Sequence, residues 1–431
     1  MKFYVANPKK RKQVYDILNI FYDHDELIFD KLADLRIEEG RIILKDEKFS
    51  YEEDELKKKL YQILAYLTSY ESPWGYLTGS KPSKLLQKMS LEEIKKKYLL
   101  SDEKIKLLSE VGSEQDKLAF DKEAFSVYIN IPFCPSRCHY CSYPTLVGGR
   151  NDKKAYIDSL IYEIENIDLP RKIDAIYVGG GTPSYIDHKD LERLLFAINE
   201  KFSYEEFTFE AGREDSLDFD KLEILKEGKV QRISLNPQSF NEEIVKRAGR
   251  SYDYENFEKI YLIARELGFI INTDFIVGLM GEGSDIFKRN FTVLKKLKPD
   301  NITFHALALK VGSKYFEENL RAKRSDSLEI SRQIRDFVKE NSYKAYYLYR
   351  QKNIVSNLEN VGYQKDATSQ RYNIIINEEL ESIIGLGMNA NSKLMNGHKF
   401  RNSRNMRDYF LKVKEEIRAK NTLINEYNRS N

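Results

Sequence analysis

The chain carries one run of cysteines, Cys134-Pro135-Ser136-Arg137-Cys138-His139-Tyr140-Cys141, with the spacing C-x-x-x-C-x-x-C. These are the only three cysteines among its 431 residues. Thiolates are the usual ligands of iron–sulfur clusters, and three of them crowded together form one sulfur face. A cluster of four irons held by three thiolates keeps one iron free of protein ligands, and an open position is typical of reactive metal sites. The stretch therefore predicts a metal cluster with one open iron.

Two other interpretations of the cysteines are weaker. A zinc site could use His139 as its fourth ligand, but His139 directly follows Cys138, and no second Cys or His pair follows at finger spacing. A disulfide is disfavoured because three neighbouring cysteines in a chain without an export signal indicate a reduced, cytosolic setting. We rank the iron–sulfur cluster ahead of zinc, and zinc ahead of a disulfide.

Composition predicts a soluble, cytoplasmic protein of two or three domains. The length exceeds that of a usual single core, and 41% of the residues are hydrophobic. Seventy basic residues face 68 acidic ones, a balance that gives no global electrostatic case for nucleic-acid binding. The basic run Lys9-Lys10-Arg11-Lys12 is interpreted as a solvated helix start. No segment has the apolar length of a signal peptide or a transmembrane helix, so neither is expected.

The pattern of the chain changes twice. Residues 1–118 are charged and free of cysteine, with helical spacing of leucines around 56–67, and predict a helix-rich N-terminal domain. Residues 119–310 alternate between short β-rich runs and helical patterns. Residues 311–431 lose this alternation and are expected to form an α+β C-terminal domain that covers the substrate. Within that last part we expect a helix at 325–340, a turn at Gly385-Leu386-Gly387, a helix at 405–420 and a frayed tail from about 424.

The alternating part predicts six strands and the helices between them. The expected strands are 125–131, 174–178, 206–211, 230–235, 269–277 and 301–306. Regular alternation implies parallel strands joined by right-handed crossovers. Because this part is shorter than the ~250 residues of a full eight-fold barrel, the fold class is α/β with a partial, open (β/α)6 barrel.

Residues with possible chemistry cluster at the C-terminal ends of these strands, where barrel active sites lie. They are Cys134 onward, Gly179-Gly180-Gly181-Thr182, Glu210, Gln238 and Asp274. The three glycines lack the spacing of a nucleotide-binding loop. They either let a ligand approach the backbone closely or form a tight turn. A single carboxylate such as Glu210 or Asp274 is more often a cap or an ion pair than a ligand contact, but its place at a strand end favours a functional role.

The motifs together resemble a known family. The cysteine spacing at the end of the first barrel strand is similar to that of the radical S-adenosylmethionine (radical SAM) superfamily. Other strings resemble its oxygen-independent coproporphyrinogen III dehydrogenase branch, of the HemZ type. They are YINIPFC from Tyr128, GGGTP from Gly179, FEAGRED from Phe209, ISLNPQSFN from Ile233, TDFIVGL from Thr273, YLYRQKN from Tyr347 and PWGYLTG from Pro73. Nearly the whole chain is covered by this resemblance.

The resemblance implies a set of cofactor contacts. Cys134, Cys138 and Cys141 would hold a [4Fe-4S] cluster whose open iron is chelated by the methionine part of S-adenosylmethionine. The implied contacts to S-adenosylmethionine are Tyr128, Tyr140, Gly180, Gly181, Thr182, Glu210, Gln238, Arg250, Asp274 and Ala308. A carboxylate such as Glu210 suits the ammonium group and a cation such as Arg250 suits the carboxylate. An aspartate at a strand end, like Asp274, suits ribose hydroxyls.

The implied reaction is radical chemistry on a tetrapyrrole. A low-potential electron donor of the flavodoxin or ferredoxin type reduces the cluster, and the resulting 5′-deoxyadenosyl radical abstracts hydrogen from a propionate side chain. Loss of carbon dioxide and one electron then leaves a vinyl group. No protein nucleophile is needed, because the cofactor carries the chemistry. Cations are needed for the substrate carboxylates, and Arg137, Arg213, Arg350 and Lys352 are candidates.

The chain departs from the family pattern at one position, and two other functions stay open. Family enzymes resemble C-x-x-x-C-x-x-C-x-C, whereas the last position here is Tyr143. The fourth cysteine is not a cluster ligand in the family, so cofactor cleavage is expected to persist while the tetrapyrrole substrate stays open. One alternative is a haem-binding chaperone of the same fold, although the H-N-x-x-Y-W motif of those relatives is absent. The other is a radical enzyme that degrades or methylates haem.

Overall fold

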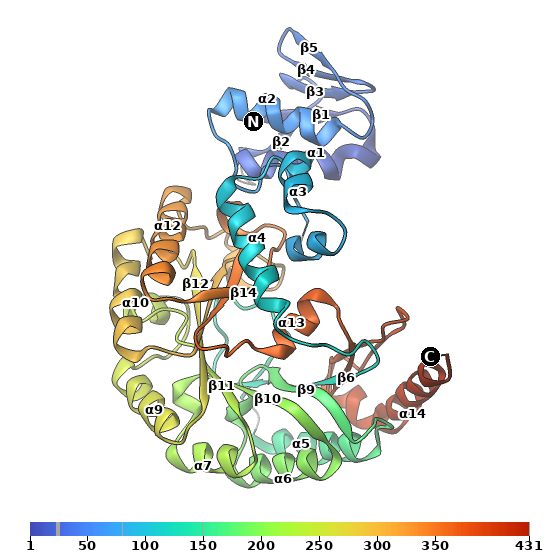
Figure 1. Cartoon of the computed structure of the whole chain (residues 1–431), viewed down its shortest axis with the longest axis vertical. Helices are drawn as coiled ribbons and strands as arrows, with labels where there is room; N and C mark the ends of the chain where they lie inside the picture. The colour runs from blue at the N-terminus through green and yellow to red at the C-terminus, as the bar shows by residue number, and fades with distance from the viewer. Residues whose placement is uncertain (23–25, 80, 149, 431) are drawn as a thin grey trace.

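The structure, a computed structural model, describes residues 1–22, 26–79, 81–148 and 150–430. A small sheet domain at the N-terminus stands at one end of the molecule, and a large curved sheet with helices on its outer face forms the rest (Figure 1). Within the described residues, no helix combines the length and the apolar character needed to cross a membrane.

The N-terminal region holds a five-stranded sheet with the strand order β2-β1-β3-β4-β5, packed against two helices. Its elements are β1 Lys2–Val5, α1 Arg11–Phe21, β2 Ile28–Phe29, β3 Leu35–Glu38, β4 Arg41–Leu44, β5 Glu47–Ser50 and α2 Leu56–Thr68. The helix at 56–67 is found as predicted. The sheet was missed because its strands have at most four residues and carry exposed charges, which leaves only two or three alternating apolar positions in each.

A helical segment joins this region to the large sheet. It contains α3 Leu91–Tyr98 and α4 Asp102–Gln115, and α3 begins with a capping box between Ser90 and Glu93. The loop before it brings Trp74 into the main hydrophobic core, where the side chain is 1% exposed. The Trp74 indole donates to Glu359 Oε2 over 2.7 Å. The PWGYLTG stretch therefore fixes the N-terminal region onto the C-terminal part of the chain.

The six predicted strand–helix units are present. Their elements are β6 Phe125–Ile131, α5 Arg150–Asn166, β9 Lys172–Gly180, α6 His188–Lys201, β10 Ser203–Gly212, α7 Phe219–Glu227, β11 Arg232–Leu235, α8 Glu242–Arg247, α9 Tyr254–Glu266, β12 Ile270–Val277, α10 Ser284–Leu297 and β13 Asn301–Ala306. A two-stranded pair, β7 Phe133–Cys134 and β8 Leu146–Val147, flanks the cysteine loop. The strands pair in parallel in the order β6-β9-β10-β11-β12-β13. Strands of a parallel sheet are usually apolar on both faces, because both faces are buried.

The C-terminal strands extend this same sheet on both sides. The remaining elements are α11 Lys314–Glu317, α12 Arg324–Glu340, β14 Lys344–Tyr349, β15 Asn360–Gln364, α13 Arg371–Glu378, β16 Ser382–Leu386, β17 Asn391–Lys393, β18 Lys399–Arg401 and α14 Met406–Ser430. β15 pairs antiparallel with β13, and β16 pairs parallel with β6. The sheet has eleven strands in the order β14-β15-β13-β12-β11-β10-β9-β6-β16-β17-β18, and it stays open because β14 and β18 lie at its two edges.

Two local predictions in the C-terminal part were wrong. Gly385 lies in a strand rather than a turn: it pairs with Tyr128, and a Cβ there would meet the backbone of Asn391 at 2.6 Å. Glycine is therefore required by close packing of two strands. The tail is helical to residue 430 rather than frayed from 424. The reason is burial, since Ile424 and Tyr427 are 1% and 4% exposed and continue the apolar face of α14.

Candidate active site

The cysteine loop begins at the end of β7 and lies over the C-terminal ends of the parallel strands. Cys134 pairs with Val147 of β8, and the Cys141 amide donates to the Cys138 carbonyl over 3.1 Å. Burial raises the pKa of Cys141 to about 11, and the charges of Cys138 and Cys134 raise it further against a backbone hydrogen bond from Tyr143. The thiols are thus close enough to repel one another as thiolates. A bound cation is what would make three thiolates stable here.

His139 is held away from the cysteine sulfurs. Its amide donates to the Ala248 carbonyl over 2.8 Å, and its ring Nδ1 lies 3.1 Å from the Arg247 carbonyl oxygen. The ring packs on Gly249, where a Cβ would come within 2.6 Å of it. His139 is therefore engaged by the end of α8 and the residues that follow it, which disfavours it as a fourth zinc ligand.

Arg213, after β10, braces the cysteine loop. Its guanidinium donates to Ser136 Oγ over 2.9 Å and forms a two-bond ion pair with Asp215 over 2.8 and 2.5 Å. Arg213 is only 5% exposed. A planar guanidinium held by a carboxylate has a fixed direction, so this contact sets the position of the loop between Cys134 and Cys138.

The three glycines at the end of β9 pack against the cysteine strand. Gly181 donates its amide to the Ile131 carbonyl over 2.8 Å, and a Cβ on it would come within 2.6 Å of the Phe133 oxygen and 3.0 Å of Cys134 Sγ. Gly180 has a φ of +121°, which disfavours any other residue. Thr182 donates its hydroxyl to Cys134 Sγ over 3.5 Å. The glycines therefore allow the backbone to pack closely against the cysteine strand. The sequence had suggested only the approach of a ligand or a tight turn.

Glu210 lies at the centre of a group of stacked tyrosines. The Tyr177 hydroxyl donates to Glu210 Oε2 over 3.0 Å. The rings of Tyr128, Tyr177 and Tyr372 stack with centroid distances of 4.7 to 6.4 Å. Burial raises the pKa of Glu210 to about 7, and the charge of Asp274 raises it further. Burial therefore favours the neutral form of this carboxyl, and a cationic ligand would favour its charged form.

Asp274 connects β12 to a second pair of side chains. Its Oδ1 accepts from Asn272 Nδ2 over 2.8 Å, and its Oδ2 lies 3.6 Å from His305 Nε2. The other ring nitrogen of His305 lies 3.1 Å from the Tyr349 hydroxyl oxygen. Gln238 donates its amide to the Asp274 carbonyl over 3.0 Å, in a left-handed conformation with φ of 66°. The strands β12, β13 and β14 and the loop after β11 thus place polar groups next to one another.

The remaining predicted cofactor residues lie nearby. Arg250 is 3% exposed and pairs with Glu214 over 2.6 Å, so its charge is already partly neutralised. Tyr140 packs on a small apolar cluster with Tyr315, and its pKa is raised by burial and then by Cys138. Ala308 forms a β-bridge with Ile354.

Several buried polar atoms near these strand ends have no partner among the described residues. They are Glu214 Oε1, Asn236 Oδ1, Gln238 Oε1, Arg250 Nε and Thr273 Oγ1. Buried polar groups in native proteins are normally hydrogen-bonded, so unpaired atoms need an explanation such as a bound polar molecule. A zwitterionic ligand with hydroxyl groups and a sulfur-bound cluster both fit the donors and acceptors present here.

The four cations expected to bind substrate carboxylates differ in their exposure and in their hydrogen-bond partners. Arg137 is exposed and donates to the Gly312 carbonyl over 2.8 Å, and Arg213 braces the cysteine loop. Arg350 is 4% exposed and donates to the carbonyls of Leu358 and Asn357, so its guanidinium is already held by backbone acceptors. Burial lowers its pKa to about 10. Lys352 lies on the surface beside the N-terminal domain.

Sequence reasoning missed Tyr177, Tyr372, His305 and Tyr349. Strand alternation would have found Tyr177, because it lies two residues before Gly179 and faces the same side of β9. His305 likewise lies one residue before the end of β13. Tyr372 follows β15 and Tyr349 ends β14, both outside the predicted barrel, so only the tertiary structure brings them to Glu210 and Asp274.

Comparison with known proteins gives consistent results. The family described as the radical SAM superfamily matches residues 128–290. An oxygen-independent coproporphyrinogen-III oxidase-like protein, HemZ of Bacillus subtilis, is 37% identical over 81% of this chain and 75% of its own length. The heme chaperone HemW of Lactococcus lactis is 29% identical over 70% of this chain and 79% of its own. The structure of coproporphyrinogen III oxidase from Escherichia coli has a similar fold, with a TM-score of 0.57 and 20% identity over 71% of this chain and 72% of that one.

Proposed function

The chain belongs to the radical SAM superfamily and, within it, to the family of the coproporphyrinogen-III oxidase-like protein HemZ, and from this membership we propose that it acts on a tetrapyrrole. The proposed reaction is oxygen-independent oxidative decarboxylation of coproporphyrinogen III propionates to vinyl groups. The observation that carries the proposal is the contact between two strand ends: Thr182 meets Cys134 Sγ beside the glycine triplet, next to Glu210.

The three cysteines and the strand ends would hold the cofactors. Cys134, Cys138 and Cys141 would bind a [4Fe-4S] cluster. S-adenosylmethionine would bind beside it and form hydrogen bonds with the unpaired polar atoms. When bound, this pair of cofactors supplies a carbon radical that can abstract hydrogen. The protein then contributes position and shielding from water, which its buried strand ends support.

Each strand end has a proposed part in binding S-adenosylmethionine. Glu210, held in direction by the Tyr177 hydroxyl, would bind its ammonium group. Arg250, whose Nε has no protein partner among the described residues, would bind its carboxylate. Asp274 would accept from the ribose hydroxyls, and Tyr140 would pack on the adenine. Gln238, Ala308, Tyr128 and the Gly180-Gly181-Thr182 turn complete the site.

Tyr143 marks the proposed place of the substrate. Its side chain is 62% exposed, yet its pKa is raised by burial and then by the charge of Glu210. The ring is therefore exposed, and it lies close enough to the buried Glu210 for the two charges to interact. Burial raises the pKa values of Tyr349 and Tyr372, and the charge of Tyr143 raises them further. An aromatic wall of this kind suits the apolar body of a tetrapyrrole, and Tyr143 would contact it where the family carries a cysteine.

The reaction would also need an electron donor. A low-potential carrier of the flavodoxin or ferredoxin type would supply the first electron, since cysteine-ligated clusters of this kind have potentials near about −400 mV. Such carriers and the free tetrapyrrole substrate are found in the cytoplasm, where we place the protein.

An anaerobic product assay tests the proposal. The protein is reconstituted with iron and sulfide and incubated with S-adenosylmethionine, a reductant and coproporphyrinogen III. The expected products are protoporphyrinogen IX, carbon dioxide and 5′-deoxyadenosine. Formation of 5′-deoxyadenosine without any vinyl product would refute decarboxylation. Running haem in parallel, with mass spectrometry of the tetrapyrroles, separates decarboxylation from degradation or methylation of haem.

A haem-binding chaperone is the second candidate, because the match to HemW covers 79% of that protein. The chaperone motif H-N-x-x-Y-W is absent, and the chain's single tryptophan, Trp74, is buried and bound to Glu359. A titration with haem tests this function: a saturable complex that transfers haem to an apoprotein supports it, and the absence of saturation excludes it.

A further inference from the structure

Hydrogen bonds join the cysteine loop to two segments that lie beside it. The His139 amide donates to the Ala248 carbonyl over 2.8 Å, and the Tyr315 amide donates to the His139 carbonyl over 3.0 Å. Arg137, in the same loop, donates to the Gly312 carbonyl over 2.8 Å. The end of α8, the cysteine loop and the segment around α11 therefore meet at one surface.

The three segments carry cations and no acid. Residues 136–140, 246–250 and 310–316 contain no aspartate or glutamate. We call their exposed cations the basic rim, which consists of Arg137, Lys246, Arg247, Lys310 and Lys314. The cysteine loop therefore lies in a local positive field, although the chain as a whole is close to neutral.

Part of the basic rim is not neutralised by a neighbouring carboxylate. Lys246 pairs with Glu242 over 3.2 Å, and Lys314 pairs with Glu318 over 3.6 Å. The rim cations that form no such ion pair within the described part of the chain are Arg137, Arg247 and Lys310. The Arg247 guanidinium lies against Gly281, in the loop after β12, where a larger residue would displace it. Unpaired surface cations attract an anionic partner.

Two exposed apolar side chains lie among these cations. Val311 is 78% exposed and Phe316 is 38% exposed. Val311 precedes Gly312, the acceptor for Arg137, and Phe316 belongs to α11. Apolar side chains surrounded by charged ones are the usual composition of a protein–protein interface. The surface therefore fits an acidic protein better than a small anion.

We propose that the basic rim is the docking surface for an acidic electron-carrier protein that reduces the cluster. The inference rests on the proposed function, which needs one electron from a low-potential donor. That electron passes from the carrier, which is oxidised, to the cluster, which is reduced, and no covalent bond forms or breaks in this step. Arg137 and His139 flank Cys138 in the sequence, so a carrier bound on the rim would contact the loop that holds the cluster.

The charges of the rim suit a short-lived complex. Positive charge around the loop steers an acidic partner toward it and increases the rate of association. Redox partners typically form small interfaces that dissociate readily, which lets a spent carrier leave after it has given up its electron. The apolar side chains at Val311 and Phe316 would then contact the carrier around its exposed cofactor edge.

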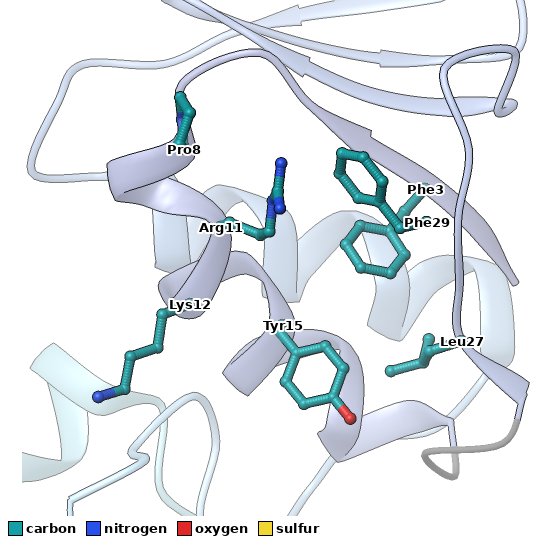
Figure 2. A pocket seen from close by; sticks show the side chains of 7 residues that line it. All are labelled: Phe3, Pro8, Arg11, Lys12, Tyr15, Leu27 and Phe29. Atoms are coloured by element: carbon teal, nitrogen blue, oxygen red, sulfur yellow. The ribbon is translucent and has the colours of Figure 1, made fainter.

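The open groove of the N-terminal sheet domain lacks these properties. It has a volume of about 550 Å³ and lies between α1 and the strands β1 and β2 (Figure 2). The cations that line it are Arg11 and Lys12, and the Arg11 guanidinium lies 4.1 Å from the centroid of the Phe29 ring. Because the groove belongs to a different sheet from the strands that flank the cysteine loop, we assign it no part in electron transfer.

Binding of flavodoxin, an acidic electron carrier, tests the inference. The reconstituted full chain is immobilised without oxygen, and its affinity for flavodoxin is measured at low and high salt, so that the readout is independent of turnover. Arg247→Glu/Lys310→Glu should weaken binding at least about tenfold at low salt, because like charges oppose docking. Added salt should weaken binding of the parent protein more than binding of the variant. The variant should retain the iron content of the parent and be reduced by dithionite at the same rate.

A second variant keeps the test independent of the fold of α8. Val311→Asp places a negative charge on an exposed loop residue and should also weaken binding. The matched control is Lys45→Glu/Lys48→Glu, which makes the same charge change as the double variant on the β4–β5 hairpin at the edge of the N-terminal sheet, and it should bind like the parent.

Three results would overturn the inference. They are flavodoxin binding that both rim variants leave unchanged, equal losses in the control, and binding of a single-stranded oligonucleotide that the rim variants abolish while flavodoxin binding persists. The outcome is separable from that of the proposed reaction. If flavodoxin docks on the rim and reduces the cluster but no vinyl product forms, the proposed reaction fails and this inference stands. If dithionite supports vinyl formation but the rim variants bind flavodoxin normally, the reverse holds.

Discussion

The Tyr177 hydroxyl donates a hydrogen bond of 3.0 Å to Glu210 Oε2, and this bond opposes the burial that raises the pKa of Glu210 to about 7. Two adjacent strands, β9 and β10, place the two side chains face to face. The bond stabilises the charged carboxylate, which is the form that a cationic ligand requires. With the proposed contact between Glu210 and the ammonium group, the affinity for S-adenosylmethionine should depend on pH.

Removing this bond should shift that pH dependence. Because Glu210 ionises as the pH rises through about 7, the affinity should increase across that range. Tyr177→Phe keeps the ring stack but lifts the pKa of Glu210, so binding at pH 7 should weaken about threefold and recover near pH 9. Calorimetric titration at several pH values measures this. Tyr372→Phe, which retains the bond to Glu210, should behave like the parent protein, and an unshifted profile in Tyr177→Phe would contradict the assignment.

Adding one methyl group at the glycine triplet should prevent cluster binding. A Cβ at position 181 would press on the Phe133 oxygen at 2.6 Å and on Cys134 Sγ at 3.0 Å. Gly181→Ala should therefore displace the cysteine strand and lower the iron and sulfide bound after reconstitution at least about twofold. Gly79→Ala is the control, since its Cβ would meet only Leu77 Cδ1 at 3.7 Å. Full iron content in Gly181→Ala would contradict this prediction and show that the cysteine strand can move without loss of the cluster.

Glu282 should make the protein less stable as the pH rises. Burial raises its pKa to about 7, against hydrogen bonds from Ser239 and Asn290. Since the folded state then holds a proton that the unfolded state releases above about 4.5, the free energy of unfolding falls between about pH 4.5 and 7. The loss amounts to at most about 3 kcal/mol. Glu282→Gln should reduce this dependence, measured by urea unfolding at pH 5.5 and 8, and an identical slope in both proteins would exclude Glu282 as its source.

Tyr143 should affect the substrate and leave the cluster intact. It lies two residues after Cys141, and its exposed hydroxyl has no place among the cluster ligands. Tyr143→Cys, which restores the family pattern, should keep the brown absorbance of the cluster. Removal of the ring should lower kcat/KM for this chain's own tetrapyrrole about tenfold, as loss of an apolar contact does. A gain in activity with coproporphyrinogen III would show instead that the cysteine is required for that substrate.

The sequence by itself predicted the strand–helix alternation of the barrel and the residues that gather at its strand ends. Alternating strands and helices of regular length admit one parallel arrangement, and parallel strands bring their C-terminal ends to one edge. Cys134, Gly181, Glu210 and Asp274 could therefore be grouped without knowledge of the fold. The glycines and the cysteines follow two strands that are neighbours in the sheet, β9 and β6, so their meeting required only the order of these two strands.

Only the tertiary structure decided which side chains from distant segments complete the site. Tyr372 and Tyr349 come from segments beyond the predicted barrel. Tyr372 on α13 stacks on Tyr177 of β9, and Tyr349 reaches His305 because β15 pairs with β13 and β14 with β15. Arg350 was expected to meet substrate and is instead buried against the N-terminal region. Local pattern fixes the direction of a side chain on its own element, and packing between elements decides what that side chain meets.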